Sequence, residues 1–106
     1  MKKSMLLGII GDTIENKVID FLIEGIGIDY SKKDIANNCD ISRSTLYKIL
    51  PNLVKSKLVK ATRVIGRSQL YSLNTENDRV KALLKLEEFL LTRSFKEIEI
   101  KPRIKI

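Results

Sequence analysis

Basic and hydroxyl-bearing side chains gather in the middle of this chain, and their types favour binding of a polyanion over bond-making chemistry. Residues 31–73 hold nine Lys and Arg residues against two Asp residues, a net +7 that equals the formal charge of all 106 residues. The sequence has no histidine and a single cysteine, Cys39, so the usual nucleophile, general-base and zinc-ligand sets are absent. We therefore expect a protein that is not an enzyme, needs no metal or cofactor, and binds a negatively charged partner.

The stretch from residue 40 to residue 53 has the pattern of an amphipathic helix. Its apolar residues fall at the spacing of one buried helix face and are Ile41, Leu46, Leu50 and Leu53. The opposite face carries Arg43, Ser44, Tyr47, Lys48 and Asn52. Side chains of these types bind phosphates and base edges. We predict a helix over residues 43–56, capped by Ser42, with its polar face turned toward a partner.

Residues 1–12 are interpreted as an N-terminal extension. Its apolar run from Met5 to Ile10 is interrupted by a glycine and is shorter than the apolar region of a signal peptide, which needs at least about 7 residues. We expect this run to pack on the protein or to face a partner. Asp12 is expected to cap a following helix that ends near Glu24, before the GIG sequence.

A second short helix is predicted from residue 31 onward. Ser31 is expected to cap it, with Asp34 in the first turn, where the helix dipole favours a carboxylate. Ile35 and Cys39 then face inward together, and we interpret Cys39 as a small core residue rather than a redox switch. A lone cysteine also fits a reducing, cytoplasmic setting.

Alternation of apolar and polar residues replaces helical spacing after residue 57. We predict a two-stranded hairpin, residues 58–64 and 69–73, with Gly66 in the turn. Arg63, Arg67 and Gln69 would lie near its tip, and Tyr71 is expected to pack within it.

Residues 75–94 are predicted to form a helix with two apolar stripes. One stripe holds Val80, Leu83, Leu84, Leu90 and Leu91, and the other holds Ala82, Leu86 and Phe89. Two stripes need two covering surfaces, and in so small a chain the second is most simply another subunit. We predict a homodimer through this helix. The alternative is one wide stripe buried within a monomer.

Residues 95–106 are interpreted as a C-terminal tail, and within it residues 98–106 alternate apolar residues or proline with charged residues. This pattern predicts an extended tail, and Pro102, which lacks an amide hydrogen, would restrict it to a sheet edge or to pairing on one side. The alternative is a tail that is disordered when alone. No stretch of about 18 uncharged apolar residues predicts a membrane span.

Three helices followed by a basic hairpin, with a short turn between the second and third, is the element order of a winged helix-turn-helix. The residues that carry a more specific resemblance are Ile35-Ala36, Ile41-Ser42, Thr45-Leu46-Tyr47 and Leu58-Val59, together with the sequence RSQLYSL. In this order the chain resembles the winged-helix transcriptional regulators of the MarR/ArsR type over residues 13–74. The expected fold is therefore mostly α with a small β-hairpin, a winged helix-turn-helix with an added C-terminal dimerisation helix. Abundant isoleucine and lysine, without tryptophan or histidine, would suit a heat-loving archaeon.

The resemblance implies a dimeric regulator that reads double-stranded DNA, with the 43–56 helix in the major groove and the 63–69 wing on the backbone or minor groove. Arg43 could contact guanine, and Lys32 and Lys33 could hold a phosphate at a helix start. The candidate DNA-binding residues are Lys32, Lys33, Ser42, Arg43, Ser44, Thr45, Tyr47, Lys48, Arg63, Arg67, Ser68 and Gln69.

Two residues depart from the family pattern. Lys57 stands where glycine commonly forms the left-handed cap after the helix, so the cap must either be built in another way or carry a cost of about 1 kcal/mol. Pro51 removes the amide that would bond to the carbonyl of Tyr47, and we expect it to bend the helix and end its DNA-facing half.

Two other functions use the same block of charge. An architectural or partition-type DNA binder would contact phosphates with little sequence preference. A winged helix can also serve as a protein interaction module, although +7 in the middle block favours nucleic acid. RNA is less favoured because no aromatic stacking platform is evident among three Tyr and three Phe residues.

Overall fold

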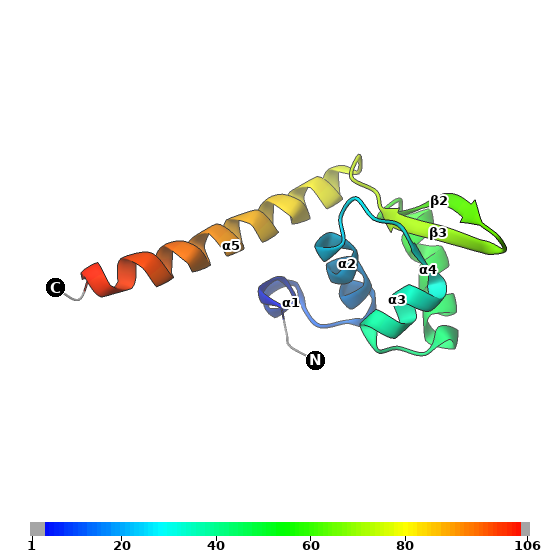
Figure 1. Cartoon of the computed structure of the whole chain (residues 1–106), viewed down its shortest axis with the longest axis horizontal. Helices are drawn as coiled ribbons and strands as arrows, with labels where there is room; N and C mark the ends of the chain where they lie inside the picture. Colours follow the sequence, from blue (N-terminus) through cyan, green and yellow to red (C-terminus); the bar gives the residue numbers. More distant parts are fainter. Residues whose placement is uncertain (1–3, 105–106) are drawn as a thin grey trace.

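The computed structural model describes the backbone of residues 4–104 and the side chains of residues 4–93. Within these residues the elements are α1 (Met5–Ile10), α2 (Ile14–Glu24), β1 (Tyr30–Ser31), α3 (Lys32–Cys39), α4 (Arg43–Lys55), β2 (Val59–Ile65), β3 (Ser68–Leu73) and α5 (Asp78–Ile104). Helices α1 to α4 and the sheet form one body, and α5 runs away from it over most of the 60 Å length of the molecule (Figure 1). The expected mostly helical fold with a small β-hairpin is confirmed.

The core lies between α2, α3, α4 and the base of the hairpin. Leu46 and Leu50 of α4 are buried, as the apolar spacing predicted, and they join Ile35 and Cys39 of α3 in one cluster. Each fully buried aliphatic side chain of this kind contributes roughly 1.5–3 kcal/mol to folding. Burial also raises the pKa of the Cys39 thiol to about 11, with the nearby Asp20 adding to the effect. The thiolate is therefore scarce at neutral pH, which suits a packing role.

Hydroxyl side chains cap all four helices of the body at their N-termini. Ser31 and Ser42 accept hydrogen bonds from the amides of Asp34 and Thr45, both at 3.1 Å, as predicted. The predicted Asp12 cap of α2 is wrong, because Thr13 takes this position and its Oγ1 accepts from the amide of the third residue on. Asp12 lies one residue too early and instead faces Lys17.

The sheet is antiparallel with strand order β1-β3-β2. The hairpin was predicted, with Gly66 at its turn in the left-handed region at φ +61°, where glycine is favoured. The third strand, β1, was not predicted. It pairs Ser31 with Leu70 and Tyr30 with Tyr71, which ties the start of α3 directly to the hairpin.

The turn after α4 contains Lys57, one of the two residues that depart from the family pattern. Lys57 has φ +64°, so it occupies the left-handed position that glycine usually fills. The amide of Leu58 bonds back to the carbonyl of Leu53, and the amide of Lys57 to that of Val54, which completes the two-bond pattern of a Schellman cap. The side-chain amides of Asn74 and Asn77 both donate to the Lys57 carbonyl and hold the turn.

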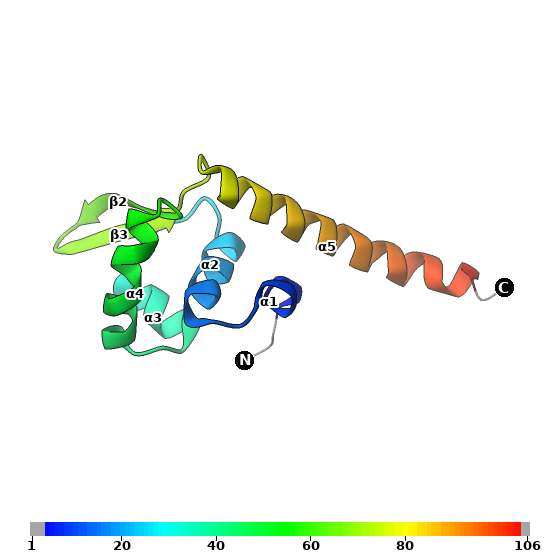
Figure 2. The ribbon, with the colours of Figure 1, turned by 180° about the vertical axis from the view of Figure 1, so that it is seen from behind.

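The N-terminal extension packs on the protein through α1, where Leu6 and Leu7 are buried. Helix α5 passes α1 and buries Val80 against the core, with Leu83 and Leu84 partly covered. Figure 2 shows the same arrangement from behind. Of the helices described, none is long and apolar enough to span a membrane.

The expected extended tail is wrong for the residues the structure describes. Helix α5 continues through Ile104 rather than ending near residue 94, and the last two residues of the predicted tail lie outside the described part. A strand needs a neighbour for its hydrogen bonds, whereas a helix satisfies them within itself. The end of α5 lies far from the sheet (Figures 1 and 2), so no strand among residues 4–104 lies beside this segment to pair with it.

Candidate nucleic-acid interface

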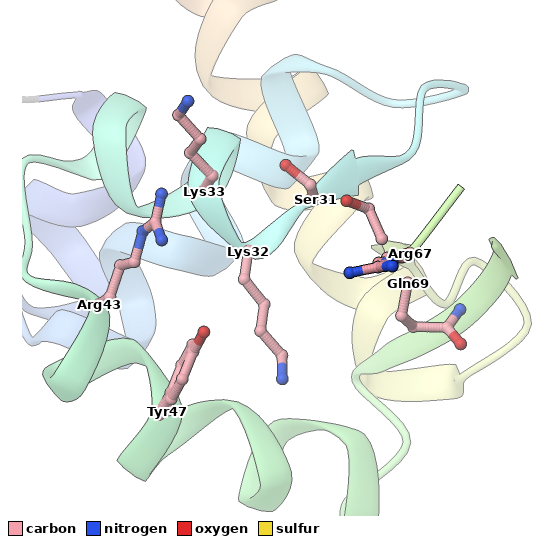
Figure 3. A pocket seen from close by; sticks show the side chains of 8 residues that line it. Ser31, Lys32, Lys33, Arg43, Tyr47, Arg67 and Gln69 are labelled. Atoms are coloured by element: carbon pink, nitrogen blue, oxygen red, sulfur yellow. The ribbon is translucent and has the colours of Figure 1, made fainter. Parts of the chain in front are cut away.

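A cleft of about 370 Å³ lies where α3, α4 and the hairpin meet. Its lining residues come from three segments far apart in the sequence and are Ser31, Lys32, Lys33, Arg43, Tyr47, Arg67, Ser68 and Gln69. Figure 3 shows Arg43 and Tyr47 projecting from α4, with Lys32 of α3 reaching into the space beside them. Seven of these eight residues belong to the candidate set, and Ser31 was predicted only as a cap.

Four of the lining side chains are cationic, and none is acidic. Lys32 and Lys33 stand in the first turn of α3, where the positive end of the helix dipole adds to their charge. Arg43 stands at the first position of α4, and Arg67 follows Gly66 at the hairpin turn. The concentration of positive charge in one concave surface favours an anionic partner.

Lys32 is held by two aromatic rings. Its Nζ lies 4.6 Å from the centre of the Tyr47 ring and 6.0 Å from that of Tyr71. Tyr71 was expected to pack within the hairpin; it lies on β3, is partly buried against the core, and also faces Lys32, a contact that was not foreseen. These cation–π contacts restrict a long flexible side chain and direct its ammonium into the cleft.

The hydroxyl residues at the start of α4 lie beside this cleft and do not line it. Ser42 Oγ lies 3.1 Å from Ser44 Oγ and 2.8 Å from Thr45 Oγ1, in addition to capping the helix. Ser42 and Thr45 therefore help to form the start of α4, whether or not they also contact a binding partner. Ser44 and Lys48 are exposed on the outer surface of α4.

Arg63 is the candidate residue that the structure places away from the cleft. Its Nε and Nη2 donate to the two carboxylate oxygens of Asp29 at 3.0 and 3.2 Å. These hydrogen bonds, with one from Thr62, lower the pKa of Asp29 to about 2, and the carboxylate in turn raises the pKa of Arg63. Asp29 was not singled out from the sequence, where it is one acidic residue in a loop with no local pattern to mark it.

Comparison with known proteins bears on the fold. The family described as the helix-turn-helix domain of resolvase matches residues 18–53, from α2 into α4. No curated protein sequence matches the chain. The structure of NadR in complex with 4-hydroxyphenylacetate is similar over 93% of this chain and 71% of that one, with 20% identity and a TM-score of 0.64.

Two further solved structures show the same similarity. MepR, a transcription regulator of the Staphylococcus aureus multidrug efflux pump MepA, matches over 95% of this chain and 70% of its own, with 18% identity and a TM-score of 0.59. Lactococcus lactis ZitR in complex with DNA matches over 95% of this chain and 69% of its own, with 18% identity and a TM-score of 0.56. The fold is a winged helix-turn-helix.

The second helix of a helix-turn-helix is by convention called the recognition helix, and the hairpin of the winged form is called the wing. Here α4 and the β2–β3 hairpin occupy these positions in the fold. The cleft therefore lies between the recognition helix, the start of α3 and the wing. A second cleft of about 470 Å³ adjoins it along α4, where Leu50, Pro51 and Val54 supply an apolar floor. The two clefts share Lys32, Tyr47 and Gln69.

Proposed function

We propose that this protein is a transcriptional regulator that binds double-stranded DNA with sequence preference, as a homodimer. The observation that carries the proposal is the cleft in which four cations from α3, the recognition helix and the wing converge with no carboxylate among them. Its similarity in fold to ZitR in complex with DNA and to MepR supports the same reading.

The recognition helix suits the major groove. An α-helix fits this groove of B-DNA, and the residues near its N-terminus are those closest to the base edges. Arg43 and Tyr47 occupy the first and second turns of α4, and both line the cleft. A guanidinium at this place can make a bidentate contact to guanine, which discriminates against the other bases by about 1–3 kcal/mol.

The residues around the recognition helix suit phosphate binding. Lys32 and Lys33 place two cationic side chains at the positive end of the α3 dipole. Arg67 and Ser68 at the wing tip would follow the neighbouring backbone or enter the minor groove. Contacts of this kind fix the register of the protein on DNA and make affinity strongly dependent on salt.

Exposed apolar side chains support the homodimer. Phe89 and Leu91 of α5 are 59% and 46% exposed, and Met5 and Ile9 of α1 lie exposed on the adjoining helix. Val80, Leu83 and Leu84 of the first stripe contact the core of their own chain, and so does Leu86 of the second. The exposed apolar surface therefore comes from Phe89 of the second stripe and from Leu91, which belongs to the first. A second copy that covered the exposed residues would remove apolar surface from water and present two recognition helices to two half-sites.

Fluorescence anisotropy on fragmented genomic DNA, over a series of salt concentrations, tests the proposal. The wild type is expected to bind some fragments more tightly than others, with affinity that falls as salt rises. The Arg43→Ala/Tyr47→Ala variant should lose the preference among fragments. Lys85→Ala, which removes one exposed charge from α5, is the matched control and should keep it.

Two outcomes would replace the proposal. If the double variant ranks the fragments as the wild type does, the protein contacts DNA without reading it, as an architectural or partition-type binder would. If neither protein binds DNA at low salt, the cleft meets a protein partner instead.

A further inference from the structure

The contacts at the base of the wing point to a role for Asp29, and this inference rests on the proposed function. We propose that Asp29 is a positioning residue, which holds a bulge in β2 and thereby sets where the wing presents Arg67 to DNA. Asp29 itself would not touch DNA. The same contact gives Arg63 a role different from the phosphate contact expected from the sequence.

The wing contains a β-bulge in its first strand. Ala61 pairs with Tyr71, and the next pair is Val64 with Gln69, so Thr62 and Arg63 together stand opposite the single residue Leu70. A bulge of this kind bends its strand and increases the local twist. It therefore determines the direction in which the distal half of the wing leaves the body.

Both residues of the bulge bind one carboxylate. Asp29 Oδ2 accepts hydrogen bonds from Thr62 Oγ1 at 2.7 Å and from Arg63 Nε at 3.0 Å, while Oδ1 accepts from Arg63 Nη2 at 3.2 Å. The Asp29 side chain is only 16% exposed, whereas that of Arg63 is 65% exposed. A planar guanidinium held at two points by a carboxylate is fixed in orientation as well as position.

The side chain of Gln69, on the other strand of the wing, donates hydrogen bonds to backbone carbonyls at the bulge. Gln69 Nε2 donates to the carbonyls of Arg63 and Leu70, at 3.1 and 3.0 Å. The bulge is therefore bonded through the side chains of both its residues and through one of its carbonyls. These contacts define the clamp, which consists of Asp29, Thr62, Arg63 and Gln69.

The wing needs such a clamp because little apolar packing supports it. In β2 only Val59 is buried, and every residue from Lys60 to Ile65 is exposed. Asp29 lies immediately before β1, whose Ser31 pairs with Leu70, and only three positions before Lys32. The clamp thus links the wing to the start of α3 and fixes the spacing between Lys32 and Arg67 across the cleft.

The charge state of the clamp distinguishes it from a DNA contact. Arg63 is already paired with a carboxylate. Its replacement should therefore remove no phosphate contact from a protein–DNA complex and should leave the salt dependence of binding unchanged. The salt slope is the slope of log affinity against log salt concentration. Removal of a residue that binds phosphate reduces the size of this slope by about one unit. For Asp29 the two roles predict opposite changes in affinity. Loss of a negative charge near DNA would by itself strengthen binding, whereas loss of the clamp should weaken it.

The test compares Asp29→Asn and Arg63→Ala with the wild type in DNA affinity, salt slope and amide hydrogen exchange of the free protein. Asp34→Asn is the control, because it removes an exposed carboxylate from the first turn of α3. We expect both clamp variants to bind DNA about two- to five-fold more weakly, the range that an exposed ion pair supports, with an unchanged salt slope. Amides of residues 64–69 should exchange faster, while those of α2 and α4 keep their protection.

Combining the two substitutions should cost no more affinity than either alone, because each removes the same contact. The proposal is overturned if Asp29→Asn strengthens binding as the control does, if Arg63→Ala lowers the salt slope by about one unit, or if wing exchange does not change. If the wild type fails to bind DNA, the proposed function falls, and the exchange measurement alone decides whether Asp29 holds the wing.

Discussion

The ammonium of Lys32 lies 4.6 Å from the centre of the Tyr47 ring, so that α3 and the recognition helix are joined by a cation–π contact inside the cleft. Such contacts contribute about 0.5–1 kcal/mol at exposed sites. The direction of the Lys32 side chain therefore depends on Tyr47, for which the sequence had suggested a direct DNA contact or a place at the rim of the core.

We predict that Tyr47→Ala lowers DNA affinity while Tyr47→Phe keeps most of it, because phenylalanine retains the ring face. The salt slope should change little in either variant, since Lys32 keeps its charge, whereas Lys32→Ala should lower it by about one unit. Anisotropy titrations at three or more salt concentrations measure both quantities. Equal losses in the two Tyr47 variants would show that the hydroxyl, and not the ring, is what matters.

The left-handed Lys57 predicts a stabilising substitution. Lys57→Gly should raise the free energy of unfolding by about 1 kcal/mol, because glycine adopts φ +64° without the steric penalty of a Cβ atom. Lys57→Ala is the matched control, since it removes the same charge and keeps the Cβ atom. Urea denaturation followed by circular dichroism compares the three proteins, and equal midpoints for glycine and alanine would contradict the strain.

Pro51 stands inside α4, which remains one helix from Arg43 to Lys55. Pro51→Ala restores the amide that can bond to the Tyr47 carbonyl and should raise stability by about 1–3 kcal/mol. If the proline also sets the direction of the DNA-facing half, the variant will change its ranking of DNA fragments. An unchanged ranking with raised stability would leave Pro51 a packing role only.

Asp20 is a buried carboxylate, 7% exposed, whose Oδ1 has no hydrogen-bond partner among the described residues. Burial raises its pKa, against a smaller opposite effect of a hydrogen bond with Ser4. The native state therefore binds this proton more tightly than the unfolded state does, so stability should fall as the pH rises through the raised pKa.

Asp20→Asn should consequently melt at a higher temperature than the wild type at pH 7, and the difference should shrink toward pH 4. Glu87, whose pKa is raised by burial and by Asp20 and Glu24, adds to the same trend. Thermal melts between pH 4 and pH 8 measure it. A constant difference across this range would mean that the substitution acts through packing and not through charge.

The exposed part of α5 predicts the oligomeric state. The wild type is expected to sediment as a dimer at micromolar concentration, and Phe89→Lys to shift it toward the monomer, because a charge would be buried at the interface. Glu88→Lys places a similar charge on the neighbouring exposed residue and should leave the dimer intact. A monomeric wild type would reject the dimer.

Local patterns in the sequence predicted the elements of this protein well. The caps Ser31 and Ser42 and the buried face of Leu46 and Leu50 depend on residues within one or two helical turns, so their spacing alone is informative. Gly66 marked the hairpin turn for the same reason. The cationic residues of the cleft were also predicted, because the number of charges in a segment of the chain is the same in any fold.

The tertiary structure determined which residues of different elements come into contact. Arg63 and Asp29 are 34 positions apart in sequence, and no spacing rule pairs them. The same holds for the pairing of β1 with β3 and for the contacts of Lys32 with Tyr47 and Tyr71. Both depend on how the helices and the hairpin pack together. The tail shows the converse. Its alternation is typical of a strand, which needs a neighbour, but as far as Ile104 it belongs to α5, whose end lies far from the sheet. Sequence thus determined the local hydrogen bonds and the charge, and packing determined which distant side chains could meet.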